Sequence, residues 1–144
     1  MCVPRYTRRT GMEKREIKND RLPYLAFPWA LSLTNVSEWL FISGTPPMDV
    51  NRKVVTDDFI EQFEYEVARI RESLEAAGMT VDDIVFLGIT VTEKADIYNT
   101  WDAFAKAYLK HFPADPGPAG GTMRVVSGLT HPKMLVEIEA IAAR

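Results

Sequence analysis

The chain has 144 residues and a formal net charge of −3, with 47% hydrophobic and 26% charged residues, as expected for one globular domain. A chain of this length buries about two-thirds of its unfolded surface, so it can fold without a disulfide or a structural metal. The single cysteine, Cys2, excludes an intrachain disulfide, and no apolar run reaches the roughly 18 residues of a membrane helix.

The charge is unevenly distributed along the chain. Residues 1–15 carry a net charge of +4, so residues 16–144 carry −7. We predict a flexible basic tail over residues 1–15 and a single domain over residues 16–144; the alternative for the tail is a basic arm that touches nucleic acid. The tail has no apolar segment behind it, so we do not expect a secretory signal. The acidic domain disfavours nucleic acid as the main partner, because phosphate binding requires clustered Lys and Arg.

The first part of the domain is predicted to contain strands. Residues 16–18 predict a short first strand, and residues 22–29, rich in proline and aromatics, predict an ordered loop. Residues 30–34 and 39–43 are β-prone runs with few residues between them, which predicts an antiparallel hairpin. Prolines 46 and 47 must end the second run.

The first helix is the clearest predicted element. Its apolar residues recur at helical spacing and are Phe59, Ile60, Phe63, Val67, Ile70 and Leu74. Residues 56–58 offer N-cap oxygens, and Gly78 stands where a left-handed C-terminal residue belongs. The opposite face is predicted to be a solvated charged surface, formed by Glu61, Glu66, Arg69, Arg71 and Glu75.

The second half of the chain predicts one more helix and three strands. Residues 84–91 read as a central strand, and a second helix starts at Asp96 or Asn99 and runs to about His111. Residues 113–121 hold three prolines and three glycines, which indicates a loop.

The last two strands are predicted over residues 122–126 and 134–142. Side chains alternate along a strand, so Val136, Ile138 and Ala140 face one side and Glu137 and Glu139 the other. The order β-β-β-α-β-α-β-β predicts an α+β fold, a mixed sheet with two helices on one face. The uncovered face then predicts self-association.

Several stretches together resemble the Rid (YjgF) family. They are residues 40–49 (LFISGTPPMD), 61–78, 82–85, 111–113, 118–119 and 135–142 (LVEIEAIA), and the resemblance covers about residues 22–142. It implies a cytoplasmic homotrimer with a chorismate-mutase-like fold, a barrel-like core of sheets and sites in clefts between subunits. It implies no cofactor, and the distant His111 and His131 do not predict a metal site.

The resemblance also implies a chemistry. Many Rid proteins hydrolyse enamines and imines, such as 2-aminoacrylate, to 2-keto acids and ammonia. In those members an arginine after Pro-Ala holds the substrate carboxylate as a bidentate fork. By this resemblance Glu137 activates water, with Glu139 as the second choice, while Ser43 and Gly44 line the cleft. Ser43 is expected to donate a hydrogen bond rather than to act as a nucleophile.

The chain departs from the family at the arginine. Counting forward from Pro-Ala places Gly120 at the arginine position, whereas counting back from the last strand places Thr122 at it. Neither residue is cationic. Arg124 is the nearest substitute, because it shares strand parity with both and lies roughly 7 Å from Thr122 and roughly 13 Å from Gly120. The alternative is an ordinary surface arginine. Tyr24 and Trp29 are expected to form a wall of the cleft or to seal the trimer core.

Three functions remain open from the sequence. The first is an enamine or imine deaminase with non-standard specificity, and a 2-aminomuconate-like compound is its candidate substrate. The alternative is a non-catalytic trimer that binds a small acid or a partner protein. A ribonuclease or translation inhibitor is a minor alternative, disfavoured by the −7 charge of residues 16–144. The expected partners are copies of the chain itself and a small carboxylate-bearing ligand, without nucleic acid or membrane.

Overall fold

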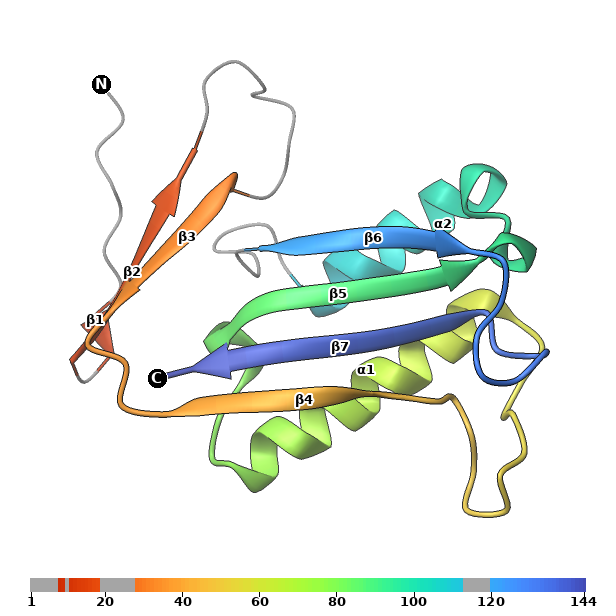
Figure 1. Cartoon of the computed structure of the whole chain (residues 1–144), viewed down its shortest axis with the longest axis horizontal. Coiled ribbons are helices and arrows are strands. Elements are labelled where there is room, and N and C mark those ends of the chain that lie inside the picture. Colours follow the sequence, from red (N-terminus) through yellow and green to blue (C-terminus); the bar gives the residue numbers. More distant parts are fainter. Residues whose placement is uncertain (1–7, 10, 19–27, 113–119) are drawn as a thin grey trace.

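The computed structural model describes residues 8–9, 11–18, 28–112 and 120–144 (Figure 1). Their strands form two sheets. The small antiparallel sheet has the order β1-β2-β3, with bounds Arg8–Arg9, Met12–Ile17 and Ala30–Thr34. The main sheet has the order β4-β7-β5-β6, with bounds Trp39–Thr45, Val136–Ala143, Ile84–Thr92 and Gly121–Val126. In the main sheet only β5 and β6 are parallel.

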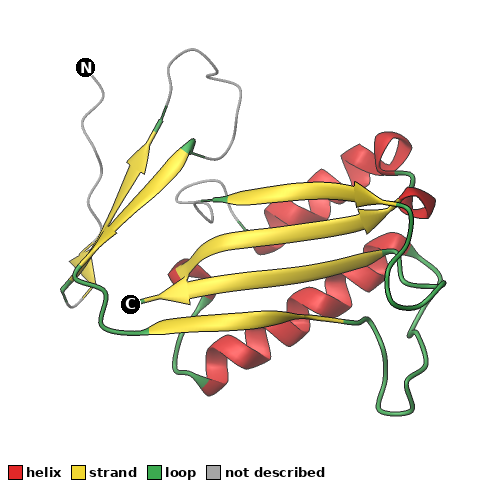
Figure 2. Cartoon of the chain, viewed as in Figure 1, coloured by secondary structure: helices red, strands yellow, loops and turns green. Residues whose placement is uncertain are grey.

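Two helices pack on one face of the main sheet, α1 (Phe59–Ala76) and α2 (Ile97–His111), and Figure 2 shows both behind it. Short 3₁₀ helices, Val81–Asp83 and Glu93–Ala95, flank β5. The predicted α+β architecture is thereby confirmed. Neither helix is both long and apolar enough to cross a bilayer.

The core lies between the helices and the sheet. Its centre is built from alternate residues of the inner strands and one stripe of α1, which are Leu87, Ile89, Val91, Val136, Ile138, Ala140, Phe63, Val67, Ile70 and Leu74. Phe104 of α2 packs edge-on against Phe63, with ring centroids 5.2 Å apart. Burial of these side chains fixes which face of each strand is turned away from the helices.

The predicted ends of α1 are confirmed. Asp58 is the N-cap, and its side chain accepts a hydrogen bond from the backbone N–H of Glu61 at 2.9 Å. Gly78 follows the helix with φ +68°, a conformation that glycine adopts without strain. Asp96 precedes α2 with φ 47° and gives it no side-chain cap.

The predicted hairpin is wrong. Strand β3 pairs with β2, whereas β4 pairs with β7 in the other sheet. The residues between β3 and β4 explain this, because the N–H groups of Ser37 and Glu38 donate to the carbonyl of Arg144, at 2.7 and 2.9 Å. The chain is therefore led to the end of β7 instead of turning back on β3.

The first strand also differs from its prediction. Strand β2 covers Met12–Ile17 rather than residues 16–18, so residues 12–15 of the predicted tail lie in a strand. Met12 is 5% exposed and packs with Val85 and Ala143 of the main sheet. Because this methionine is buried, the strand begins nearer the N-terminus than predicted. The small sheet thereby covers one end of the main sheet.

One residue of the predicted solvated face of α1 is buried. Glu66 is 0% exposed, as is Gln62 one turn before it. Both side chains bind backbone N–H groups at or just before the start of β7: Gln62 Oε1 accepts from Leu135 at 2.8 Å, and Glu66 Oε2 accepts from Ile138 at 2.7 Å. A backbone N–H group in the interior needs an acceptor, which explains why an acidic residue, Glu66, is buried here.

Candidate functional site

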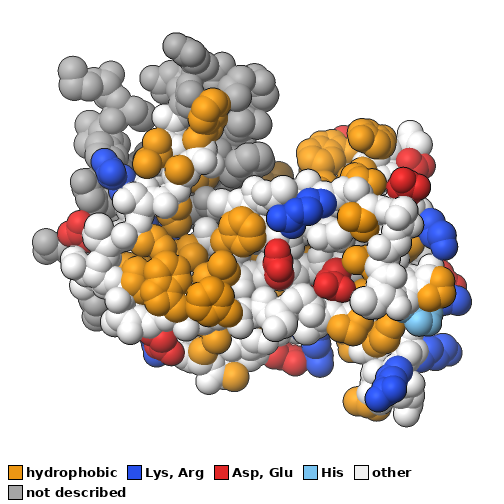
Figure 3. All heavy atoms as spheres, viewed as in Figure 1, with side chains coloured by type: hydrophobic (Ala, Val, Ile, Leu, Met, Phe, Trp, Pro, Cys, Tyr) orange, Lys and Arg blue, Asp and Glu red, His pale blue; other side chains and the backbone are white. Residues whose placement is uncertain are grey.

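The candidate site lies on the sheet face turned away from the helices, here called the open face. The strand register orders its residues in rows. Thr90 of β5 lies between Glu137 of β7 and Arg124 of β6. In the next row Gly88 lies between Glu139 and Thr122. Because neighbours in a row share a face, two carboxylates and one guanidinium meet on the open face, and Figure 3 shows basic and acidic side chains side by side at its middle.

A β-bulge in β4 shapes one side of this face. Ile42 pairs with Ala140 and Thr45 with Ile138, so Ser43 and Gly44 together oppose Glu139. Such a bulge leaves an extra residue unpaired and bends the strand locally. The bulge therefore brings both residues of the Ser-Gly pair to the candidate site.

Gly44 makes room for Glu137. A Cβ atom at Gly44 would stand 2.7 Å from Oε1 and 3.0 Å from Cγ of Glu137. The Glu137 side chain therefore lies directly over the Gly44 backbone and is only partly exposed. Gly44 was expected to line a cleft, and its close packing with Glu137 gives a physical reason for glycine at this position.

Gly88 has the same relation to Glu139. A Cβ atom there would stand 2.5 Å from Glu139 Oε1. Sequence reasoning did not single out Gly88 or Thr90. The only signal was a glycine inside a strand of β-branched and large apolar residues, which often marks a close approach of another group.

Arg124 lies beside Glu139. Its Nη1 is 3.8 Å from Glu139 Oε1, and the two side chains are 47% and 55% exposed. An exposed pair of this kind contributes only about 0–1 kcal/mol to stability. Arg124 is thus on the same face as Thr122, and its contact with Glu139 is a weak one.

An apolar patch adjoins these charges. Trp39 and Phe41 of β4 are 50% and 72% exposed, and their rings stack with centroids 6.5 Å apart. Figure 3 shows hydrophobic side chains gathered at this end of the face, next to the acidic and basic groups. A contiguous apolar patch rimmed by polar groups is typical of an interaction surface.

Glu66 lies on the helix side of β7, below the open face. The pKa of Glu66 is raised to about 9, mainly by burial and also by the negative charge of Glu137, while the hydrogen bond from Ile138 opposes this shift. Glu66 is therefore protonated near neutral pH. Its Oε1 is buried and has no hydrogen-bond partner among the described residues.

Two predicted site residues lie elsewhere, and a third is outside the described part of the chain. Trp29 precedes β3 in the small sheet, where its backbone N–H donates to the carbonyl of Ile17 at 2.9 Å. Gly120 precedes β6, and its carbonyl accepts from the N–H of Leu87 at 2.9 Å. Tyr24 lies outside the described residues. The structure thus brings Ser43, Gly44, Thr122, Arg124, Glu137 and Glu139 together, but not Trp29.

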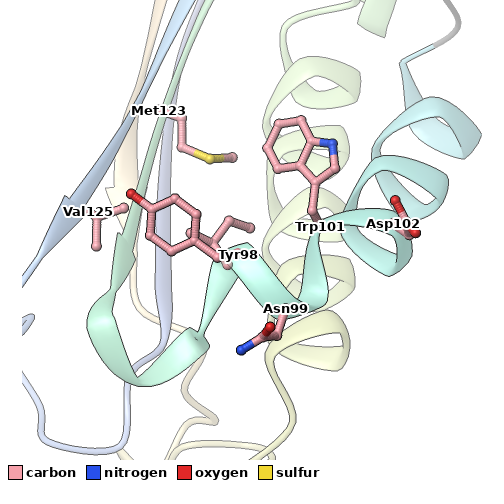
Figure 4. A pocket seen from close by; sticks show the side chains of 7 residues that line it. Tyr98, Asn99, Trp101, Asp102, Met123 and Val125 are labelled. Atoms are coloured by element: carbon pink, nitrogen blue, oxygen red, sulfur yellow. The ribbon is translucent and has the colours of Figure 1, made fainter.

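A separate cavity of about 530 Å³ lies between α2 and β6 (Figure 4). Tyr98 and Trp101 of the helix and Met123 and Val125 of the strand line it. Met123 and Val125 alternate with Thr122 and Arg124, so the cavity is on the helix side of the sheet. It is not part of the candidate site.

Comparisons with known proteins agree with this geometry. Residues 23–144 match the family model described as Endoribonuclease L-PSP. The structure is similar to crystal structures of two Yersinia pestis proteins of the conserved Rid family, both of unknown function. YyfB is 26% identical, with a TM-score of 0.66 over 91% of this chain and 98% of YyfB. YyfA is 27% identical, with a TM-score of 0.64 over 91% and 99%. The yeast protein YEO7 is 25% identical, with a TM-score of 0.63 over 90% and 92%.

Proposed function

The chain belongs to the Rid (L-PSP endoribonuclease) family, and from this premise we propose that it hydrolyses small enamines or imines to keto acids and ammonia. The observation that carries the proposal is the placement of Glu137 over Gly44, at a β-bulge that also presents Ser43. We assign Glu137 the role of the water-activating glutamate, because the sequence around it resembles the last strand of the family. Its carboxylate lies on the open face, where a substrate and a water molecule can reach it.

The reaction needs one base and one anion-binding group. A proton from solvent adds to the enamine carbon and gives the iminium ion, and water then adds to its C=N carbon. Glu137 accepts a proton from that water as the C–O bond forms. Glu137 returns this proton to the carbinolamine nitrogen, the C–N bond breaks as the hydroxyl group loses its proton to solvent, and ammonia leaves. Enamine and water thus become keto acid and ammonia.

Arg124 is the proposed holder of the substrate carboxylate. It stands one row from Glu137 across Thr90, and a substrate acid would take the place of Glu139 at its guanidinium. Ser43 and Thr122 supply hydroxyl groups on the same face. An arginine at this position, two residues from Thr122, favours a substrate other than aminoacrylate, such as the longer 2-aminomuconate.

We propose a cytoplasmic homotrimer as the active form. Trp39 and Phe41 leave an apolar patch beside the carboxylates, and neighbouring copies would cover it. The clefts between copies would then exclude water from the site, which strengthens its electrostatic interactions.

The test is ammonia release from 2-aminoacrylate and 2-aminomuconate generated in place. The protein should accelerate at least one of them, and acceleration of 2-aminomuconate alone would indicate the shifted specificity. Glu137→Gln should abolish the acceleration while ligand affinity is largely kept, because the amide cannot accept the proton. Unchanged turnover in this variant would refute the role of Glu137.

A second candidate is a non-catalytic trimer that binds a small acid or a partner protein. Two observations favour it: neither Gly120 nor Thr122 is cationic, and Arg124 is paired with Glu139. Binding of a keto acid without acceleration of either enamine would support this candidate over the deaminase.

A further inference from the structure

The structure places an unusual group directly beneath the candidate site. Glu66 of α1 is completely buried, yet only one of its carboxyl oxygens is hydrogen-bonded among the described residues. A buried polar atom without a partner costs on the order of 1–3 kcal/mol. Glutamate at this position therefore weakens the fold, and a group of this kind is expected where function requires it.

Glu66 belongs to a pair of tethers between α1 and β7. Gln62 binds the N–H of Leu135, and Glu66 binds the N–H of Ile138. The two bonds attach β7 on either side of Glu137. The position of the Glu137 backbone is therefore set from the helix side of the sheet.

The β-bulge explains why the second tether is needed. The β4–β7 register shifts between Ile42 and Thr45, which is where Ile138 pairs. A bulge disrupts the regular ladder and loosens the hold of one strand on its neighbour. The bond to Glu66 supports β7 at this irregular point, from the helix side.

The protonation state of Glu66 matters for Glu137. The pKa of Glu66 is raised by burial and by the charge of Glu137, so the Glu66 carboxyl stays neutral near neutral pH. A neutral acid can still accept the N–H of Ile138 through its carbonyl oxygen. It does so without placing a second negative charge below the base.

We propose that Glu66 is a positioning residue for Glu137: from the helix side of β7 it holds the N–H of Ile138 and so keeps Glu137 over Gly44. This inference rests on the proposed function for its catalytic consequence. The coupling between the two carboxyl groups does not depend on turnover.

The first test measures that coupling directly. Carboxyl ¹³C NMR of the full chain, labelled at glutamate, should show one group that titrates far above the others and that is absent in Glu66→Gln. In Glu137→Gln this titration should move to lower pH, because the charge that raises it is gone. A midpoint unchanged in Glu137→Gln would overturn the proposal, whether or not the protein is an enzyme.

The second test measures turnover of the in-place enamines. Glu66→Ala should lower kcat about tenfold or more with KM little changed, because Glu137 loses its alignment. Glu66→Gln keeps an acceptor for Ile138 and should restore kcat. Val67→Ala is the matched control, since Val67 is a buried neighbour on α1 that packs only in the core.

The control separates positioning from stability. Val67→Ala should lower the Tm but keep kcat. Equal loss of kcat in Glu66→Ala and Val67→Ala, or no rescue by Glu66→Gln, would overturn the proposal. If the wild-type protein turns over neither enamine, the proposed deaminase function fails, and the NMR titration alone decides whether Glu66 and Glu137 are coupled.

Discussion

At the scale of single residues, two glycines control how the two acids lie on the open face. The side chains of Glu137 and Glu139 occupy the space where Gly44 and Gly88 would carry a Cβ atom. The atoms in that space are side-chain atoms, Oε1 and Cγ of each glutamate, so a methyl group would displace the two side chains rather than meet another backbone. The glycines therefore govern the position of each carboxylate more than the stability of the sheet.

We expect Gly44→Ala to lower kcat at least tenfold, because the new methyl group pushes Glu137 out of place. The Tm should fall only slightly. Gly88→Ala is the matched substitution, since it displaces Glu139 instead. Rates of ammonia release for both variants will distinguish the two acids, and a larger loss in Gly88→Ala would transfer the base role to Glu139.

Arg124 gives a second prediction at this scale. Arg124→Ala should weaken the binding of pyruvate, the product of 2-aminoacrylate hydrolysis, by about 2 kcal/mol or roughly thirtyfold, since a charged hydrogen-bond donor is lost. Titration calorimetry measures this directly. Arg69→Ala is the control, because Arg69 also forms an exposed ion pair but on α1. Equal affinities in the two variants would make Arg124 an ordinary surface residue.

Sequence reasoning placed the acids and Arg124 on one face because alternation along a strand is a local property. It could not find Gly88 and Thr90, which join the site only through the register of β5 with its neighbours. Glu66 was wrongly assigned to the solvated face of α1, because its charge was given more weight than its position along the helix. It lies three residues after Phe63 and four before Ile70, at the edge of the apolar stripe, and this spacing was the available signal.

At the scale of elements, Glu66 joins α1 to β7, and its carboxyl group stays protonated in the folded chain to a higher pH than in the unfolded chain. The unfolded chain releases this proton near the ordinary value of 4.5, whereas the folded chain keeps it until about 9. Between these values the unfolded state binds fewer protons. Glu66 therefore lowers the free energy of unfolding as pH rises, by up to about 1.4 kcal/mol per pH unit.

Glu66→Gln removes this dependence, because an amide does not titrate. The variant should be more stable than the wild type at pH 8, and the difference should shrink toward pH 5. Denaturant unfolding at several pH values between 5 and 9 measures it, since the other titrating groups are common to both proteins. A difference that stays constant over this range would show that Glu66 is not protonated in the fold.

The elements themselves were predictable to different degrees. Both helices, β5 and β6 followed from periodicity, β-branched runs and caps, which are properties of neighbouring residues. The pairing of β4 was not predictable in this way, because its partner β7 lies some hundred residues further along the chain. Two β-prone runs with a short connection favour a hairpin, but here the hydrogen bonds to Arg144 decide the path.

At the scale of the whole molecule, the open face holds both the candidate site and an exposed apolar patch. The helices cover one face of the main sheet, and the small sheet covers only one end of the other. Trp39 and Phe41 remain exposed beside Glu139. Assembly through this face would bury the patch and enclose the carboxylates in the same step.

Phe41→Ser should weaken self-association, because it removes the most exposed ring of the apolar patch. Light scattering should then give a mass closer to the 16.3 kDa of one chain than for the wild type at equal concentration. Tyr98→Ser is the control, since Tyr98 is 87% exposed but lies on α2, on the far side of the sheet. A Phe41 variant that keeps the wild-type mass would exclude this face as the interface.

The position of the carboxylates beside the apolar patch has a consequence for how activity depends on the amount of protein in the cell. If neighbouring copies complete each site, an isolated chain carries the chemical groups but no enclosed site. The fraction of assembled chains rises with more than the first power of chain concentration. Near the assembly threshold, halving the synthesis of this protein would therefore remove more than half of its activity, and a modest rise in expression would act as a switch.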